Sequence, residues 1–235
     1  MEIKTIYGQS FESNMHIIIS GNEFLLIDAS CSIDKVEEVI GEFEFASKNQ
    51  LNLKNSKEIA LNKENSSQNI MHSTLHSMVC LGVVITHGHF DHIYKLDEYV
   101  QNNALIYLTK ECMQNLKNPY TNGSIICLKK PLYEEFSNFN FVILEKNSQI
   151  KVGDEILKVK QTAGHTNCSI SLYDENNLFS GDLLFAGGYI GRYDLPTSNK
   201  QELKQSIEWV NTLNNKKVHS GHGENFYLND YEFKI

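Results

Sequence analysis

Residues 86–92 read Thr-His-Gly-His-Phe-Asp-His, and they directly follow the apolar run Leu-Gly-Val-Val-Ile at residues 81–85. That run has the length and the branched side chains of a buried strand, so the metal-binding residue types begin where a strand ends. Three imidazoles and one carboxylate fall within the last six residues of the stretch. These groups are usual protein ligands of zinc, iron and manganese. The stretch therefore predicts a metal site at the end of a buried strand.

The spacing within residues 86–92 suits two adjacent metal ions better than one. His87 and His89 lie two positions apart, so in extended backbone their side chains point to the same side. Asp91 and His92 follow after a bend and can face a second point nearby. The alternative, that these are ordinary surface or core polar residues, fits poorly with their density directly after a buried strand.

Three later stretches carry the same residue types after short apolar segments: Thr-Ala-Gly-His-Thr at 162–166, Phe-Ser-Gly-Asp-Leu-Leu-Phe at 179–185 and His-Ser-Gly-His-Gly at 219–223. Together with residues 86–92, they resemble in order and content the motifs of the metallo-β-lactamase superfamily, which begin with H-x-H-x-D-H. The resemblance runs from about residue 14 to residue 223. It implies an α/β (α+β) fold, the four-layer αββα sandwich, whereas periodicity alone indicates only mixed α and β.

The resemblance also implies a set of ligands and the cofactors. The cofactors would be two divalent metal ions, with zinc expected and iron or manganese as alternatives. Asp91 would also be catalytic, orienting the nucleophile or receiving its proton, and Asp28 would support the metal-binding loop. The first metal would be held by His87, His89 and His165, the second by Asp91, His92 and His222, with Asp182 bridging the two.

Residues 182–196 narrow the resemblance to short, bacterial glyoxalase II-like hydrolases (hydroxyacylglutathione hydrolase-like) and to persulfide dioxygenases, which share a G-D-x-L-F…G-R-x-D-x-P segment. Longer glyoxalase II enzymes carry a further helical domain that holds glutathione. Only thirteen residues follow His222, so no such domain is expected here. Specificity for glutathione thioesters therefore does not follow from the resemblance.

The first expected function is hydrolysis of a thioester or a small ester by a metal-bound hydroxide, which forms because bound metal lowers the pKa of water to roughly 7. One alternative is a persulfide dioxygenase, which resembles this pattern but uses one iron held by the equivalents of His87, His165 and Asp182. A second is a lactonase; such enzymes place a tyrosine where this chain has Phe185, and here Tyr189 or Tyr193 would have to substitute for it. A third is a metal-binding module without catalysis, which the complete ligand set disfavours.

Arg192 is the only arginine in the chain, and it lies ten residues after Asp182. Its planar fork can bind a carboxylate through two hydrogen bonds, which lysine cannot do. One interpretation is an internal ion pair that braces the loop, and this is slightly favoured. The other is substrate binding, with Arg192 as a clamp for an anionic group.

Composition bounds the class of protein. A chain of 235 residues can form one sizeable core, and residues 1–235 are expected to be a single domain. The formal charge of −8 argues against nucleic acid as a partner. No apolar run approaches the roughly 20 residues that span a bilayer, and the N-terminus does not read as a signal peptide. We therefore expect a small-molecule substrate, no membrane contact and a cytoplasmic location, with a homo-oligomer left open.

The five cysteines form no C-x-x-C pair, which favours a reducing compartment over a disulfide framework. Cys168, three residues after His165, is expected to be a small buried thiol rather than a ligand.

The pattern of apolar residues predicts the elements around the motifs. Residues 16–28 form a hairpin with its turn at 20–22, and residues 32–42 form a helix. Residues 44–78 are an insertion rich in Asn, Ser and Lys, with one or two short helices and with His72 and His76 exposed. Further helices are expected at 93–100 and 199–213, and strands at 104–108, 141–144, 149–152, 155–161, 169–173, 177–180 and 217–220.

Overall fold

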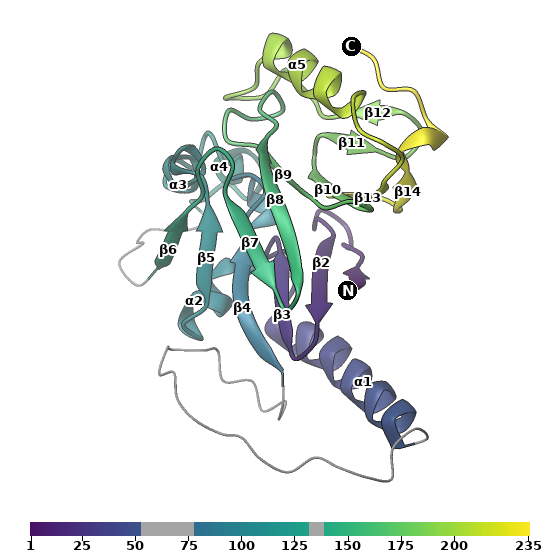
Figure 1. Ribbon diagram of the computed structural model, residues 1–235. Helices are drawn as coiled ribbons and strands as arrows, with labels where there is room; N and C mark the ends of the chain where they lie inside the picture. Colours follow the sequence, from purple (N-terminus) through teal and green to yellow (C-terminus); the bar gives the residue numbers. More distant parts are fainter. Residues whose placement is uncertain (53–77, 132–138) are drawn as a thin grey trace.

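The computed structural model describes residues 1–52, 78–131 and 139–235, and two six-stranded sheets form its centre (Figure 1). Strands run in the order β1-β2-β3-β4-β5-β6 in the first sheet and β14-β13-β10-β9-β8-β7 in the second. The first sheet comprises β1 (Glu2–Ile6), β2 (Met15–Ser20), β3 (Glu23–Ile27), β4 (Val79–Val84), β5 (Leu105–Leu108) and β6 (Asn140–Ile143). The second comprises β7 (Gln149–Val152), β8 (Glu155–Gln161), β9 (Ile170–Tyr173), β10 (Asn177–Gly181), β13 (Lys217–Ser220) and β14 (Phe226–Tyr227).

Both sheets are mixed. Strands β3, β4, β5 and β6 run parallel to one another, whereas β1, β2 and β3 are antiparallel neighbours. In the second sheet β10 and β13 are parallel, and the other neighbouring strands are antiparallel. A small third sheet pairs β11 (Leu184–Phe185) with β12 (Tyr189–Ile190).

Alternation along the strands explains why the sheets stack face to face. In β2, Ile17 and Ile19 point to one hydrophobic cluster while Ile18 points to another, and all three are buried. Strand β3 repeats this pattern, with Leu26 on the first side and Leu25 on the second. A sheet that is buried on both faces needs a layer on each side. The first sheet is therefore an inner layer of the sandwich.

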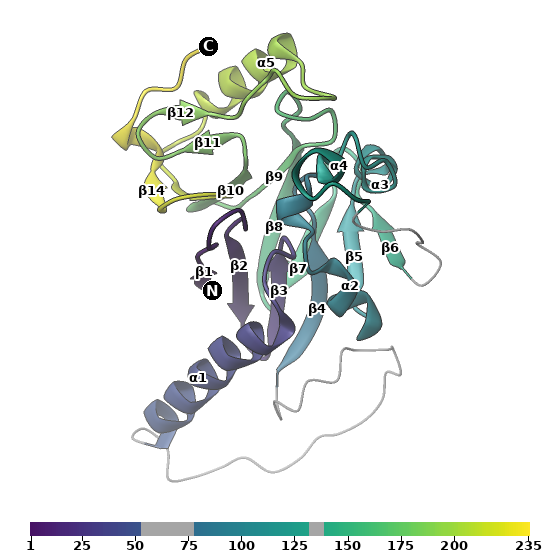
Figure 2. The same ribbon diagram turned by 180° about the vertical axis from the view of Figure 1, so that it is seen from behind.

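Helices form the two outer layers, as Figures 1 and 2 show. The outer face of the first sheet packs against α1 (Ile33–Asn52), α2 (Leu96–Gln101) and α3 (Lys110–Leu116). The outer face of the second sheet packs against α5 (Lys200–Val210), through Leu203, Ile207 and Val210. The expected four-layer αββα sandwich is confirmed. That residues 1–235 form a single domain stays a prediction.

Most expected elements are present, with shifted ends. The hairpin is confirmed as β2 and β3, and the helix expected at 199–213 is α5, which Asn199 caps by accepting hydrogen bonds from the Gln201 and Glu202 amides at 2.9 and 3.2 Å. Leu213 lies beyond the end of α5. The helix expected at 93–100 is α2, which begins only at Leu96 and is preceded by a 3-10 turn, η1 (Phe90–His92).

The boundary of the expected insertion is wrong at its start. Helix α1 does not end near residue 42 but continues to Asn52, so the first part of residues 44–78 is helical. Residues 53–77, which include His72 and His76, lie outside the described residues. The composition of residues 44–52 is polar, but it contains no proline or glycine that would end a helix.

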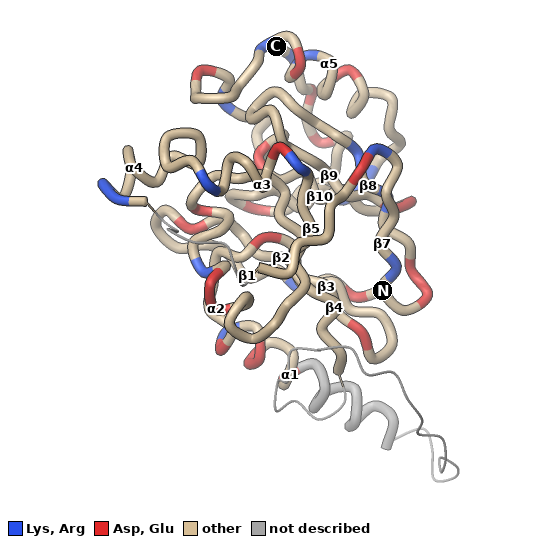
Figure 3. The backbone as a smooth tube through the Cα atoms, turned by 90° about the vertical axis from the view of Figure 1, so that its left-hand side faces the viewer, with Lys and Arg blue, Asp and Glu red and all other residues tan. Residues whose placement is uncertain are grey.

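Surface charge in the described chain is mixed in sign. Figure 3 shows basic and acidic positions interspersed along the loops and helices. Among the helices described, none is both long enough and apolar enough to cross a bilayer.

Candidate metal centre

All seven side chains that the sequence assigns to metal binding meet at one edge of the sandwich. Parallel strands place their carboxyl ends at the same edge of a sheet, and the seven residues follow the carboxyl ends of β4, β8, β10 and β13. Their ligand atoms form two groups, in each of which all atoms lie within 4.8 Å of one another. The groups are His87, His89 and His165, and Asp91, His92, Asp182 and His222.

The first group brings three ring nitrogens to one point. His89 Nδ1 lies 3.1 Å from His87 Nε2 and 3.0 Å from His165 Nε2. All three rings are buried. Three imidazole nitrogens directed at one point are the donor arrangement of a metal site with an open position.

The second group centres on Asp182, which also reaches the first. Its Oδ1 lies 3.1 Å from His92 Nε2, while its Oδ2 lies 3.5 Å from His165 Nε2 and 3.7 Å from His222 Nε2. Asp91 Oδ2 lies 3.0 Å from His222 Nε2. The two oxygens of Asp182 therefore face both groups, as the expected bridging role requires.

Asp28 fixes the orientation of two rings from behind. It accepts hydrogen bonds from the Thr86 amide at 2.8 Å and the Thr86 hydroxyl at 2.9 Å, and His92 Nδ1 donates to it at 2.7 Å. Because the Thr86 hydroxyl donates to Asp28, it can only accept from His87 Nδ1, 3.2 Å away. In the neutral rings, Nε2 of His87 and of His92 is consequently unprotonated and faces the centre.

His165 is oriented by backbone. Its Nδ1 donates to the carbonyl oxygen of Arg192 at 2.8 Å, which leaves Nε2 free of a proton in the neutral ring. The loop after β10 thus contributes Asp182 directly and holds His165 through Arg192.

Unpaired buried atoms test whether a cation fits the site. His92 Nε2 and Asp182 Oδ1 are buried and make no hydrogen bond, although they lie 3.1 Å apart. Buried polar atoms without partners are rare in folded proteins because they lose hydration without compensation. An unprotonated ring nitrogen beside a carboxylate oxygen is a donor pair for a divalent cation, so the residues fit the implied metals.

The electrostatics of the group agree with this fit. Burial, together with the nearby His92 and His89, holds the pKa of His87 well below its usual value, and burial chiefly lowers the pKa of His89 to about 4. Neutral imidazole is the form that binds metal. Burial alone would also lower the pKa of His92, but the carboxylates of Asp182 and Asp28 raise it well above its usual value. The surroundings of His92 therefore favour a positive charge.

Asn14 holds the loop that carries His222. Its Nδ2 donates to the carbonyl oxygens of Ser220 at 3.0 Å and Gly223 at 2.8 Å, on either side of His222. The Asn14 amide donates to the Gly221 carbonyl at 2.6 Å. Gly221 leaves no room for a larger residue, because a Cβ there would collide with Asp182 Oδ1 and His92 Cε1. The beginning of the first sheet thus positions the last ligand loop of the second.

The side chain of Arg192 forms the pairing that the sequence slightly favoured. Its Nε and Nη2 donate to the two carboxylate oxygens of Asp194 at 3.0 and 2.9 Å. Both side chains are exposed, and such surface pairs contribute little to stability. That Arg192 also binds substrate stays a prediction.

Cys168 is buried and belongs to neither group of ligand atoms. Its thiol lies 3.3 Å from the Asn115 side-chain nitrogen and 3.3 Å from the Thr166 hydroxyl oxygen. All five cysteines of the chain are free thiols.

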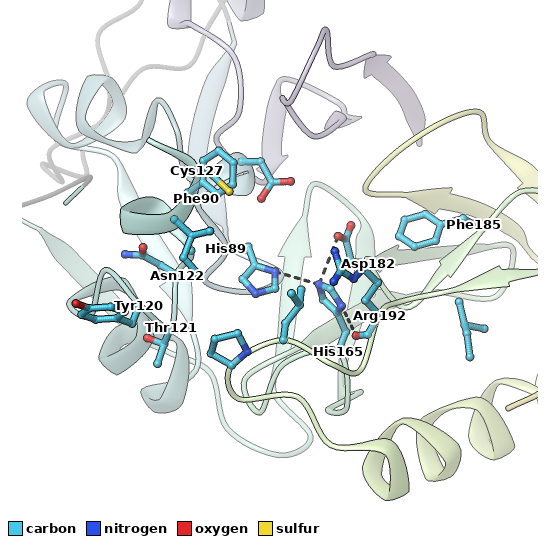
Figure 4. A pocket seen from close by; sticks show the side chains of 16 residues that line it. His89, Phe90, Tyr120, Thr121, Asn122, Cys127, His165, Asp182, Phe185 and Arg192 are labelled. Atoms are coloured by element: carbon cyan, nitrogen blue, oxygen red, sulfur yellow. Dashed lines mark hydrogen bonds and ion pairs between the residues drawn. The ribbon is translucent and has the colours of Figure 1, made fainter. Parts of the chain in front are cut away.

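A cavity of about 460 Å³ opens beside the two groups. Figure 4 shows His89, His165 and Asp182 close together, with Phe185 on one side and Tyr120 and Asn122 on the other. No local pattern in the sequence indicates the wall formed by residues 120–127, because its role depends on where the chain folds back. Asn14 and Thr86 were missed for the same reason.

The order and geometry of these ligand residues match a known protein family. Residues 80–222 match the model of the metallo-β-lactamase superfamily. The chain belongs to this superfamily. Superfamily membership and the two groups of histidine and aspartate side chains together make it a metal-dependent hydrolase.

Proteins similar to this chain differ in sequence identity and in the share of the chain that they cover. The chain is 33% identical over 149 residues to a probable metallo-hydrolase of Methanocaldococcus jannaschii, covering 60% of this chain and 69% of that protein. It is 27% identical over 161 residues to a hydroxyacylglutathione hydrolase of Hydrogenovibrio crunogenus, covering 66% and 50%. The crystal structure of the BLEG-1 B3 metallo-β-lactamase superposes with a TM-score of 0.70 at 23% identity, covering 97% and 95%. This last likeness concerns the fold alone.

Proposed function

We propose that the chain hydrolyses a thioester or a small ester with two divalent metal ions, zinc in the first instance. The observation that carries the proposal is the position of Asp182, whose two oxygens face both groups of ligand atoms. The distant likeness to a hydroxyacylglutathione hydrolase supports thioesters as the substrate class. The free cysteines suit a reducing cytoplasm as the place of the reaction.

Bound divalent cations supply two things to such a reaction: they polarise the carbonyl group and lower the pKa of water to roughly 7. The protein supplies orientation and proton handling. Asp28 fixes the ring of His92 directly, and it fixes the ring of His87 through the Thr86 hydroxyl. Asp91 lines the cavity with its carboxylate, where it can orient the attacking water or accept its proton.

The overall reaction is balanced by water alone. The water oxygen bonds to the carbonyl carbon, and the carbon–sulfur bond breaks. One proton of the water ends on the thiol, and the other is released as the new carboxylic acid ionises. A thiolate is a good leaving group, so no strong general acid is required for this step.

The lactonase alternative finds less support in the cavity. Phe185 lies at the wall, its ring 6.2 Å from that of His222, and it has no hydroxyl to offer. Tyr189 is 71% exposed, and neither Tyr189 nor Tyr193 is among the described residues that line the cavity.

The test measures metal content and reaction type on the same preparation. We expect two ions per chain and release of thiol from acyl thioesters, with Asp91→Asn retaining its fold and losing turnover. Oxygen uptake with a persulfide by an iron-loaded protein, without thioester hydrolysis, would instead establish the dioxygenase alternative. If the protein shows neither activity with zinc or with iron, the alternative of a metal-binding module without catalysis remains.

A further inference from the structure

The cavity beside the ligand groups is apolar over most of its described wall. Phe90 and Ile126 lie on the side of α4 (Ser124–Cys127), and Phe185, Ile190 and Leu195 come from the loop after Asp182. Burying one methylene group against such side chains strengthens binding about fourfold. A substrate group that enters the cavity therefore binds more tightly the more methylene groups it contains.

Two polar side chains of the wall, those of Thr121 and Asn122, are already engaged within it. The Thr121 hydroxyl lies within hydrogen-bonding distance of the carbonyl oxygens of Asn115 at 3.2 Å and Asn118 at 3.1 Å. The amide of Asn122 donates to the Leu116 carbonyl at 3.0 Å and accepts from the Ser124 amide at 2.8 Å. These groups stabilise the wall itself, so a polar substrate group would have to displace an existing partner.

The charged lining offers an anion little net attraction. Apart from Asp91 and Asp182, Arg192 is the one charged residue among the described residues that line the cavity. Its Nε and Nη2 donate to the two carboxylate oxygens of Asp194 at 3.0 and 2.9 Å, so a negative charge already lies beside the guanidinium. A substrate carboxylate would compete with Asp194 for this cation, and a carboxylate that enters apolar surroundings unpaired is strongly disfavoured.

We infer that the site selects a thioester or ester whose acyl group is uncharged and apolar. The inference rests on the proposed function and names its substrate class. The acyl chain enters between Ile126 on one side and Phe185 and Leu195 on the other, and the aliphatic stem of Arg192 covers part of it. Asp194 acts as a selectivity element by offsetting the charge that the guanidinium would otherwise present to anionic substrates.

Two matched substrates test this: the hexanoyl and adipoyl thioesters of N-acetylcysteamine, which differ only by a terminal carboxylate. With the metal-loaded protein we expect kcat/KM to be about tenfold or more higher for the hexanoyl thioester. It should also exceed that of the acetyl thioester, because four more methylenes are buried. Equal rates for the three thioesters, or faster adipoyl turnover, would overturn the inference.

Two variants locate the selectivity. Asp194→Asn frees Arg192 and should raise kcat/KM for the adipoyl thioester several-fold, with the hexanoyl value unchanged. Ile126→Lys adds a cation at a position that is 64% exposed, and it should lower the hexanoyl value while raising the adipoyl value. Ile156→Lys is the matched control, because Ile156 is 48% exposed on β8 and does not line the cavity. Identical changes in the two lysine variants would overturn the inference.

A binding measurement separates this inference from the proposed function. The hexyl and carboxypentyl thioethers of N-acetylcysteamine cannot be hydrolysed, and calorimetry gives their Kd directly. Tighter binding of the hexyl thioether supports the inference even if no thioester is hydrolysed, in which case the proposed function alone fails. Equal or weaker binding of the hexyl thioether contradicts the inference even if hydrolysis is found.

Discussion

Replacing Asn14 by alanine should loosen the loop that carries His222 without touching any ligand atom. The side chain is 2% exposed and donates to the Ser220 and Gly223 carbonyls at 3.0 and 2.8 Å. The Ser220 carbonyl keeps a second partner in His16 Nε2 at 3.2 Å, whereas the backbone amide of Gly8 loses its bond to Asn14 Oδ1 at 3.1 Å. The three lost hydrogen bonds amount to about 1.5–4.5 kcal/mol of unfolding free energy.

The effect on metal binding should be confined to one ion. His222 belongs to the second group of ligand atoms, whereas the first group contains no residue of that loop. Loss of an outer partner of a ligand typically weakens metal binding about 10–100-fold. In Asn14→Ala we therefore expect one ion to remain tightly bound and the other to dissociate during dialysis.

Urea unfolding and metal analysis by mass spectrometry on the same samples measure both effects. Asn211→Ala is the control, since Asn211 is exposed at the end of α5 and its loss should change the unfolding free energy by less than about 0.5 kcal/mol. Asn14→Asp can still accept from the Gly8 amide but cannot donate to the Ser220 and Gly223 carbonyls, so it should lose the same ion as Asn14→Ala. Wild-type stability and two retained ions in Asn14→Ala would refute the role assigned to this residue.

Three further predictions concern other parts of the site. Asp182→Ala should lower metal content and turnover together, because its carboxylate faces both groups; two retained ions with normal turnover would remove it from the bridging role. Burial lowers the pKa of His16 to about 4, so stability should be complete above about pH 6.5 and fall by roughly 3 kcal/mol as the pH drops to 4. His16→Gln should reduce that slope in urea unfolding at a series of pH values without abolishing it, because burial also lowers the pKa of His89 and of His219. An unchanged slope would exclude His16 as a contributor. Arg192→Lys loses the two-point contact with Asp194, and thermal unfolding should show almost no change in Tm, since the pair is exposed; a large drop in Tm would mean that the loop depends on the pair.

The ligand positions could be predicted from sequence because each lies directly after an apolar strand. The carboxyl ends of parallel strands meet at one edge, so residues 86–92, 162–166 and 219–223 come together once the sheets form. Local spacing also separated His87 and His89 from Asp91 and His92, and the two groups of ligand atoms divide in the same way.

Contacts between distant parts of the chain could not be predicted in this way. Asn14 and Ser220 are 206 residues apart, and no local pattern reports their hydrogen bond. Strand β1 was missed because it is an edge strand of only partly buried residues, with little apolar alternation. A local signal for α3 existed and was overlooked: Thr109 caps it by accepting from the Cys112 amide at 3.1 Å.

The metal centre joins two halves of the chain that the sheets leave as separate layers. His87, His89, Asp91 and His92 belong to the half that forms the first sheet, and His165, Asp182 and His222 to the half that forms the second. Each group of ligand atoms contains residues from both halves, so an ion bound to either group would link the two halves of the chain. A cation at a hundred times its Kd would add about 2.7 kcal/mol to the free energy of unfolding. Metal supply would then govern how long a newly made chain escapes proteolysis, as well as how fast it turns over.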